Sequence, residues 1–384
     1  MGRDNDVIAL LTNKGGASML LNGLKVLDFS ALLPGPFATM MLADLGAEVV
    51  HITKPATGEG RWIVDDYLQR SKKSLAVNLK DPTVIEHLRE LVAHYDIVVE
   101  QFRPGVMERL GLGYEALKEV NPSIIYCSIS GYGQTGPYKD KGGHDINYVS
   151  LAGIHGYSGS QQQGPPNLGI QIADLAGGSL HAVVAILAAV IYRTRTGEGQ
   201  QLDISMTDCA LALNALAAPE FLVQGKPLER EQMMLNGGSF YGHFETQDGR
   251  YMSVGSIEPK FRQALCMAIN RQDLLPLVMS YKPADELVFK QQLAEIFKAK
   301  TYAQWVEIFA KTDACVEPVL SFEETVTHPL FLARNMFVDI TKEDGTIQKQ
   351  LACPIKSNVF QPIYTAACEA IGEHNEDILG LPIK

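Results

Sequence analysis

The first half of the chain alternates short apolar runs with segments in which apolar residues recur every three or four positions. The run at 24–29 is continuous enough for a strand buried on both faces. After the turn at 34–36, helical spacing predicts a helix that Gly46 ends, and 47–52 predicts the next strand. The same alternation predicts strands at 74–79, 96–100 and 123–128 and helices at 82–94 and 114–120. We therefore expect an α/β fold with right-handed crossovers and a doubly wound, mostly parallel, Rossmann-like sheet.

The second half divides at a change of composition. A long apolar helix at 175–194, a strand at 201–206 and an alanine- and leucine-rich helix at 207–224 precede a linker at 225–240. Beyond it we expect strands at 241–246 and 250–255, and helices near 260–269, 285–299 and 302–311. The predicted organisation is a large α/β domain at 21–224, a smaller α+β domain with linkers at 225–329, and a segment at 330–384 that returns to the large domain. Residues 1–20 are read as an extension ahead of the first strand.

The composition is ordinary for a soluble enzyme. Of 384 residues, 46% are hydrophobic and 20% are charged, and the net charge of −11 argues against nucleic-acid binding. The six cysteines are scattered without a C-x-x-C spacing, which favours a reducing, cytoplasmic location. The longest apolar stretch, Leu180 to Tyr192, is shorter than the roughly 20 residues that span a bilayer. With no secretory signal at the N-terminus, we expect no membrane partner.

Two short segments, 142–148 and 173–179, carry the candidate chemistry. The first, G-G-H-D-I-N-Y, places His144 in a glycine-started turn, and the second, A-D-L-A-G-G-S, places Asp174 at the start of the long apolar helix. A histidine and an aspartate on opposite sides of one carbon can remove a proton from one face and return one to the other, as racemisation requires. Glycines 177 and 178 would let a ligand approach, and free N–H groups at the helix start suit an enolate oxygen.

Each candidate also has a structural interpretation. Local sequence alone favours a helix cap for Asp174, because this residue stands directly before a helical apolar run. His144 by itself would be an ordinary hydrogen-bonded histidine, and the neighbouring Asp145 leaves both interpretations open. No metal is expected, because no His-x-x-x-His pair and no Cys/His cluster with ligand spacing occurs.

Basic residues gather ahead of position 145 and indicate either a solvated basic face or a phosphate site. Loops after the strands of an α/β sheet are where such ligands usually dock, which favours the phosphate site. No G-x-G-x-x-G follows the first strand and no Walker motif occurs, so a nicotinamide or flavin dinucleotide is not expected. The glycine-rich stretch at 131–137 is read as a loop that lines a pocket. The candidate phosphate ligands are Arg70, Lys72, Lys73, Arg103, Arg109 and Lys141.

Several motifs in order along the chain carry a resemblance to a known family. They are L-P-G-P-F-A at 33–38, A-D-L-G-A-E-V-V at 43–50, F-R-P-G-V-M-E-R-L-G-L-G at 102–113, G-Y-G-Q-T-G-P-Y at 131–138, T-G-E-G-Q at 196–200, V-G-S-I-E-P-K-F at 254–261 and D-A-C-V-E-P-V at 313–319. On these motifs the chain resembles the family III CoA-transferase (CaiB/BaiF) superfamily. The G-H-D-I-N-Y at 143–148 makes it most similar to the α-methylacyl-CoA racemases within that superfamily.

The resemblance implies an isomerase that interconverts 2-methylacyl-CoA thioesters and needs no prosthetic group. His144 and Asp174 would be the two bases, with Asp145 orienting His144 and Glu258 tuning the pair. The family also implies an interlocked homodimer, with the active site between the large domain of one chain and the small domain of the other. His51 departs from the pattern, since racemases often carry arginine at that position near the CoA nucleotide.

Two other functions stay open at this point. In a CoA-transferase, Asp174 would be the nucleophile and would form a mixed anhydride with the acyl group. A CoA-ester binding protein would show no turnover. Exchange of the α-proton with solvent distinguishes the racemase from both.

Overall fold

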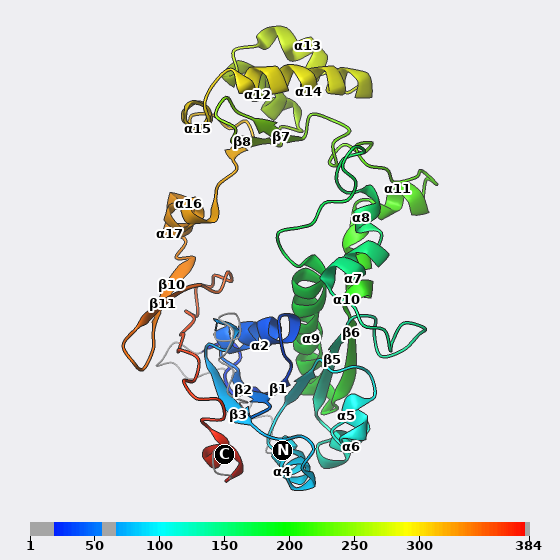
Figure 1. The fold of residues 1–384 in the computed structure, drawn as a ribbon, viewed down its shortest axis with the longest axis vertical. Coiled ribbons are helices and arrows are strands. Elements are labelled where there is room, and N and C mark those ends of the chain that lie inside the picture. Colours follow the sequence, from blue (N-terminus) through cyan, green and yellow to red (C-terminus); the bar gives the residue numbers. More distant parts are fainter. Residues whose placement is uncertain (1–18, 56–66, 381–384) are drawn as a thin grey trace. The chain divides into compact units, whose positions relative to one another are not determined.

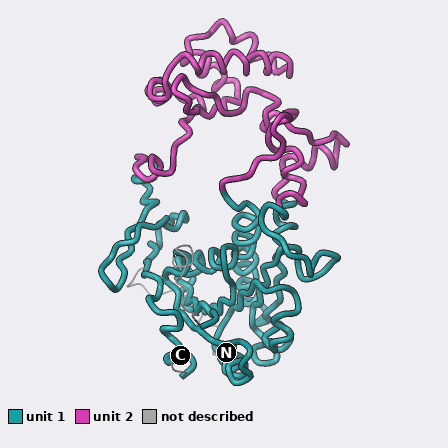
Figure 2. The backbone as a smooth tube through the Cα atoms, viewed as in Figure 1, with its two compact units in different colours: residues 1–148, 170–212, 330–384 teal, residues 149–169, 213–329 magenta. Residues whose placement is uncertain are grey.

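The computed structural model describes residues 19–55 and 67–380, and most of the predicted N-terminal extension lies outside them. The chain forms two compact units (Figure 2). Unit 1 comprises 1–148, 170–212 and 330–384, and unit 2 comprises 149–169 and 213–329. The second unit therefore begins at 213 rather than at the predicted 225, and it takes 149–169 as well. The segment from 330 onward belongs to unit 1.

A parallel sheet is the centre of unit 1 (Figure 1). Among the described residues its six strands lie in the order β3-β2-β1-β4-β5-β6, and each neighbouring pair is parallel. This is the Rossmann strand order, in which the winding reverses between β1 and β4. The strands are β1 (Lys25–Phe29), β2 (Glu48–Thr53), β3 (Lys72–Ala76), β4 (Ile97–Glu100), β5 (Ile125–Ser130) and β6 (Gln200–Ser205). The predicted fold class is confirmed.

Helices cover both faces of this sheet. On one face, α4 (Pro82–Val92), α5 (Val106–Arg109) and α6 (Tyr114–Val120) bury apolar side chains against alternate strand residues such as Leu27 and Val98. On the other face lie α2 (Pro34–Asp44) and α9 (Leu180–Thr196). The remaining elements of unit 1 are α7 (Asp145–Leu151, which runs into unit 2), α10 (Met206–Ala212), the hairpin β10 (Phe337–Thr341) and β11 (Ile347–Leu351), and α18 (Asn375–Leu379).

Three predicted elements differ from the observed ones. Strand β3 begins at Lys72 rather than 74, because a buried ion pair lets this lysine enter the sheet. The long apolar helix begins with a π-helical segment, η1 (Ala173–Ser179), that continues directly into α9. The predicted helix at 207–224 is broken into α10, the 3-10 turn η2 (Leu213–Ala215) and α11 (Ala218–Leu222). Pro219 lies in the first turn of α11, where its missing N–H does least harm.

Unit 2 is a small α+β body built around aromatic residues. Its antiparallel sheet has the order β7 (Gly242–Glu245), β8 (Tyr251–Val254) and β9 (Val316–Pro318). Phe297 packs on Trp305 with ring centroids 4.9 Å apart. The helices are α8 (Ile154–Tyr157), α11, α12 (Pro259–Ala268), η3 (Gln272–Leu274), α13 (Leu275–Val278), α14 (Pro283–Lys298), α15 (Tyr302–Phe309), α16 (Phe322–Thr327) and α17 (Pro329–Ala333), which begins at the boundary.

One helix in the described residues is long and apolar enough to cross a membrane. It runs over the 24 residues Ala173–Thr196, and an 18-residue window in it has a mean hydropathy of 2.0, so the expectation of a stretch too short for this was wrong. The π-helical start supplies the extra length. Residues such as Ala182 and Ile186 are buried in unit 1, 39% of the window is buried in all, and a single helix of this kind is weak support for a membrane span.

Candidate active site

Asp174 lies inside the π-helical segment and does not cap it. The N-cap residue is Ile172, which has no side-chain capping bond. The acceptor comes from another helix instead, because Oδ1 of Asp145 accepts from the N–H of Ala173 at 2.6 Å and from that of Asp174 at 3.0 Å. Since an outside carboxylate satisfies these N–H groups, the capping interpretation of Asp174 is wrong, and its side chain is available for other chemistry.

The carboxyl group of Asp174 is a much weaker acid than usual. Burial, together with the negative charge of Asp145, raises the pKa of Asp174 to about 6, and the nearby charge of His144 opposes this rise. A carboxyl group with a pKa near neutrality can both accept and donate a proton at the working pH. His144 is therefore electrostatically coupled to Asp174, as a proton-transfer pair requires.

The motif G-H-D-I-N-Y folds as one self-capped helix start. The N–H of His144 donates to Oδ1 of Asn147 at 3.0 Å, and the N–H of Asn147 donates to the carbonyl of His144 at 2.8 Å. The hydroxyl of Tyr148 donates to the carbonyl of Gly143 at 2.5 Å. These bonds hold the backbone of His144 on both sides while the residue stays exposed. Position and exposure together suit an imidazole that meets a substrate.

Tyrosine rings pack closely around the loop that precedes His144. Tyr132 packs edge-on against Tyr148 with centroids 5.2 Å apart, so the predicted loop at 131–137 contacts the helix start that carries His144. A Cβ atom at Gly143 would lie 2.7 Å from the hydroxyl of Tyr132 and from a ring carbon of Tyr148. Only glycine fits there.

Asp145 makes a contact that the resemblance does not imply. The family assigns it to orienting His144, which stays a prediction, and in the structure its Oδ1 accepts from the two N–H groups at the start of η1. It thereby ties the helix that follows His144 to the segment that carries Asp174. The structure thus gives Asp145 a positioning role toward Asp174.

Two of the N–H groups that were predicted to hold an enolate at the start of η1 have other acceptors. The N–H of Asp174 is used by Asp145, and that of Leu175 donates to the carbonyl of Gln171 at 3.0 Å. Gly177 and Gly178 do not admit a ligand, since added Cβ atoms would lie 3.2 Å from the carbonyl oxygen of Met206 and 3.0 Å from its Cγ. These glycines let α10 pack closely against η1.

Two of the six candidate phosphate ligands lie in the interior and form structural ion pairs. Arg70 holds Asp44 through two bonds of 2.9 and 2.6 Å, and its side chain is 2% exposed. Lys72 donates to Asp28 at 3.2 Å and to Thr39 at 2.7 Å. Burial alone would raise the pKa of Asp28, but the charge of Lys72 outweighs it and holds that pKa well below its usual range. Assigning Arg70 and Lys72 to CoA phosphates is therefore corrected, because their donors are used and buried.

The other four basic residues are exposed or partly exposed. Lys73 pairs with Glu48 at 3.0 Å. Nη2 of Arg103 lies 3.2 Å from where a Cβ of Gly142 would stand, which brings this guanidinium beside the loop before His144. Two more are exposed: Arg109, in α5, and Lys141, whose Nζ lies 3.6 Å from the ring centroid of Tyr138.

A cavity of about 470 Å³ opens at the carboxyl ends of β1 to β4, where the strand order reverses. Ligands of open α/β sheets bind at this place. Sequence reasoning missed its polar residues, although each follows a strand and the same rule could have found them. The lining consists of Phe29, Ser30, Ala31, Leu32, Ile52, Thr53, Lys54, Val77, Asn78, Leu79, Lys80, Gln101 and Phe102.

The resemblance singles out two further residues. Glu258 is in unit 2, where it is the exposed N-cap residue of α12, and its part in the site stays a prediction. His51, in β2, has Nδ1 3.6 Å from Oδ2 of Asp28. The position that is often arginine in racemases thus faces the buried Asp28–Lys72 pair.

Comparisons with known proteins identify the family of this chain. The model of CoA-transferase family III matches residues 21–375. The human α-methylacyl-CoA racemase is 40% identical over 366 residues, covering 94% of this chain and 93% of its own. The human succinyl-CoA:glutarate CoA-transferase is 31% identical, covering 94% of this chain and 85% of its own. A CaiB/BaiF family protein from Brucella suis has a similar structure, with a TM-score of 0.80, 28% identity and coverage of 93% and 98%.

Proposed function

This chain belongs to CoA-transferase family III, and from that premise we propose that it interconverts the (R) and (S) forms of 2-methylacyl-CoA thioesters. The observation that carries the proposal is the bond of 3.0 Å from the N–H of Asp174 to Asp145, the residue after His144, which holds the two segments together. The pKa of Asp174, raised to about 6, suits the same role. The similarity to racemases at 40% identity, against 31% for a glutarate CoA-transferase, supports the same choice.

The reaction moves one proton off the α-carbon and another onto its opposite face. In one direction, a neutral His144 takes the α-proton and the electron pair moves into the thioester carbonyl, which becomes an enolate. Protonated Asp174 then donates its proton to the other face, leaving an imidazolium and a carboxylate. The opposite direction starts from that protonation state, so the same pair serves both enantiomers. The thioester supplies the acidity of the α-carbon, and no electron sink is needed.

The CoA portion would lie in the cavity where the strand order reverses. Lys54 and Lys80 line this cavity, and the exposed Arg103 and Arg109 belong to the segment that follows β4. Cations at such loop positions suit the phosphates of CoA. Lys141, at the loop before His144, would meet the same ligand nearer to the reacting end.

We also propose a homodimer, as the resemblance implies. Exposed apolar side chains occur in both units, with Val184 and Ile191 of α9 at 66% and 54% exposure and Leu222 of α11 at 77%. Surfaces of this kind mark interaction sites in many proteins. All six cysteines lie in the described residues and none of them forms a disulfide there, which suits the cytoplasmic location that we propose. Sedimentation of an active monomer would contradict the dimer.

The transferase alternative uses Asp174 as a nucleophile and gives His144 no chemical role. Incubation with a 2-methylacyl-CoA in deuterated water, without any acceptor acid, distinguishes the two. A racemase incorporates α-deuterium and equilibrates the two epimers. If no deuterium enters and addition of a free acid starts CoA transfer, the racemase proposal is wrong.

A further inference from the structure

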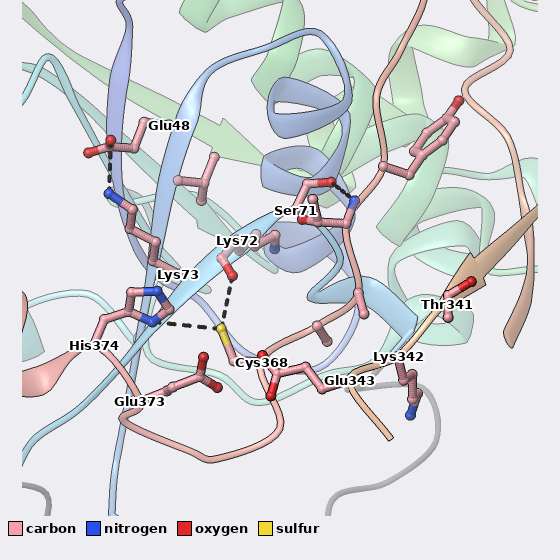
Figure 3. Close-up of a pocket in the computed structure, with 15 residues that line it drawn as sticks. Glu48, Ser71, Lys72, Lys73, Thr341, Lys342, Glu343, Cys368, Glu373 and His374 are labelled. Carbon is pink, nitrogen blue, oxygen red and sulfur yellow. Dashed lines mark hydrogen bonds and ion pairs between the residues drawn. The ribbon is translucent and has the colours of Figure 1, made fainter. Parts of the chain in front are cut away.

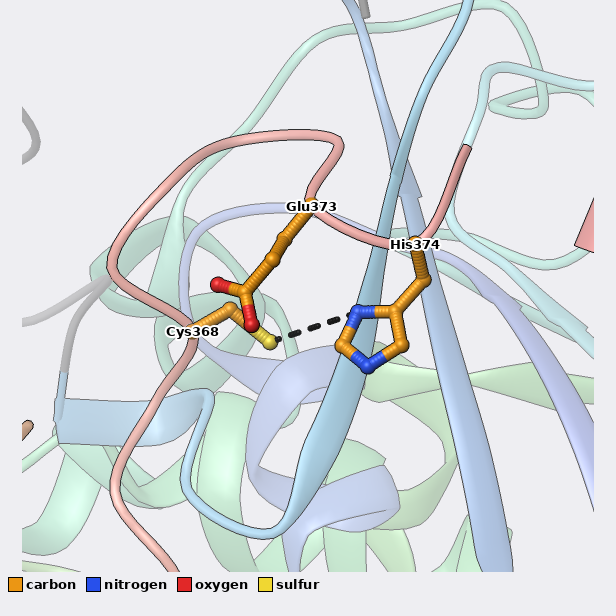
Figure 4. A group of neighbouring side chains, drawn as sticks. All are labelled: Cys368, Glu373 and His374. Atoms are coloured by element: carbon orange, nitrogen blue, oxygen red, sulfur yellow. Dashed lines mark hydrogen bonds between the residues drawn. The ribbon is translucent and has the colours of Figure 1, made fainter. Parts of the chain in front are cut away.

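Cysteine, glutamate and histidine side chains from one turn near the end of the chain meet at the edge of the large sheet. Figure 4 shows the Cys368 thiol, the Glu373 carboxylate and the His374 imidazole converging, and one donor atom of each lies within 4.8 Å of the others. Sγ of Cys368 is 3.8 Å from Nδ1 of His374 and donates to the carbonyl of Lys72 at 3.3 Å. This group lies apart from the residues assigned to proton transfer and to CoA.

The turn is fastened to β3, the edge strand of the sheet. The N–H of His374 donates to the carbonyl of Ser74 at 3.0 Å, and the side-chain amide of Asn375 bonds both backbone groups of Ala76 at 2.8 Å. A Cβ atom at Gly372, whose φ is +80°, would lie 2.7 Å from that of Ala76, so the turn fits closely. The three side chains are therefore held on a strand edge rather than on a loose terminus, as a preorganised site requires.

The spacing of the donor atoms fits a shared metal ion. Bonds of about 2.3 Å to sulfur and about 2.0 Å to nitrogen, at a tetrahedral angle, put these two ligands about 3.5 Å apart. The observed 3.8 Å between Sγ and Nδ1 is near that value, and it is long for a hydrogen bond. Nδ1 of His374 also accepts from the N–H of Ser74 at 3.4 Å, and a bound ion would take the place of this long bond.

The group forms part of the wall of a cavity of about 580 Å³ (Figure 3). Lys73 and Glu48, which also line it, neutralise each other at 3.0 Å. A metal ion held by the three side chains would keep one position toward this cavity, where water can bind. Zn²⁺ takes thiolate, imidazole and carboxylate ligands, and catalytic zinc sites have three protein ligands and one open position.

We propose that Cys368, Glu373 and His374 bind one thiophilic divalent cation, with Zn²⁺ the best match to their ligand types. On binding, the Cys368 thiol loses its proton to solvent and the thiolate sulfur bonds the ion, together with neutral imidazole and the carboxylate. The two negative ligand charges balance the ion. No motif in the sequence predicted this site, because C-x-x-x-x-E-H matches none of the usual zinc spacings. The bound ion would clamp the C-terminal turn onto β3.

Metal counting and spectroscopy on the full chain test this proposal. The protein is stripped with a chelator and dialysed against Zn²⁺, the bound metal is counted by mass spectrometry, and Co²⁺ is then used to record thiolate-to-cobalt absorption. We expect about one ion per chain, a charge-transfer band, and proton release on binding. Cys368→Ser should abolish the band and weaken binding by at least ~100-fold, more than the loss of an outer partner costs.

Matched variants separate this site from adventitious binding. Glu373→Gln keeps the thiol and the shape of the turn, and it should weaken binding without removing the band. Glu369→Gln changes an exposed acid in the same turn, and Cys315→Ser removes an exposed thiol elsewhere, so both should bind as the wild type does. Less than stoichiometric metal in the wild type, or unchanged binding by Cys368→Ser, would overturn the proposal.

Discussion

Asp145→Asn tests whether the link between the two halves of the site sets the acid strength of Asp174. The carboxylate of Asp145 accepts from two backbone N–H groups, at 2.6 and 3.0 Å, and its charge is the second cause of the raised pKa of Asp174. The amide oxygen of asparagine can accept the same two bonds, but it carries no charge. The substitution therefore keeps the two hydrogen bonds to the start of η1 and removes the negative charge beside Asp174.

Two magnitudes follow from these contacts. Charged acceptors contribute about 1.5–3 kcal/mol per hydrogen bond and neutral ones about 0.5–1.5, so two bonds that lose their charge cost about 2 kcal/mol of stability. Asp145→Ala leaves both N–H groups without their acceptor and should cost about 2–5 kcal/mol. Without the charge of Asp145, the pKa of Asp174 falls below about 6, although burial still holds it above the ordinary 3.8.

The pH profile of α-deuterium exchange measures the second effect. The active form of the pair carries one proton, so activity falls on the acid side as a second proton binds. In Asp145→Asn this acidic limb should move to lower pH, because the carboxyl group has become the stronger acid. Asp140→Asn removes an exposed charge from the same loop and should leave the limb in place. If Asp145→Asn still exchanges the α-proton and the acidic limb of its pH profile does not move, the charge of Asp145 does not set the pKa of Asp174.

Three further predictions address other parts of the molecule. His144→Ala should slow α-proton exchange by roughly 10²–10⁴, the range for a positioned acid or base; exchange near the wild-type rate would reject the two-base mechanism. Lys80→Gln and Arg109→Gln should raise KM and reduce its dependence on salt, with kcat changed less, and an unchanged KM in both would reject the CoA site. Burial raises the pKa of Glu100 from 4.5 to about 7, so the folded state binds the proton more tightly and stability falls as pH rises between these values. Glu100→Gln should therefore stabilise the protein at pH 8 by roughly 3 kcal/mol and flatten this dependence in chemical unfolding, while unchanged stability would contradict it.

The parallel sheet could be predicted from the sequence because its central strands are apolar on both faces. Runs such as those around Leu27 and Val98 have no polar side to present to water, so they reveal buried parallel strands directly. Lys72 shows where this reading fails. A lysine at the start of β3 suggests a loop, and its burial is stabilised only because Asp28 of β1, two strands away, pairs with it.

The sequence singles out the two groups that we propose for proton transfer, whereas it does not reveal the contacts that support them. His144 and Asp174 stand in short glycine-flanked segments that are visible in the sequence. The partner of the η1 N–H groups is Asp145, 28 residues away from Ala173, and no local pattern pairs them. The cap that η1 lacks in its own sequence is supplied by the residue after His144. The charge of Asp145 also contributes, second to burial, to the raised pKa of Asp174, so one residue outside η1 both bonds its first N–H groups and weakens the acid that it carries.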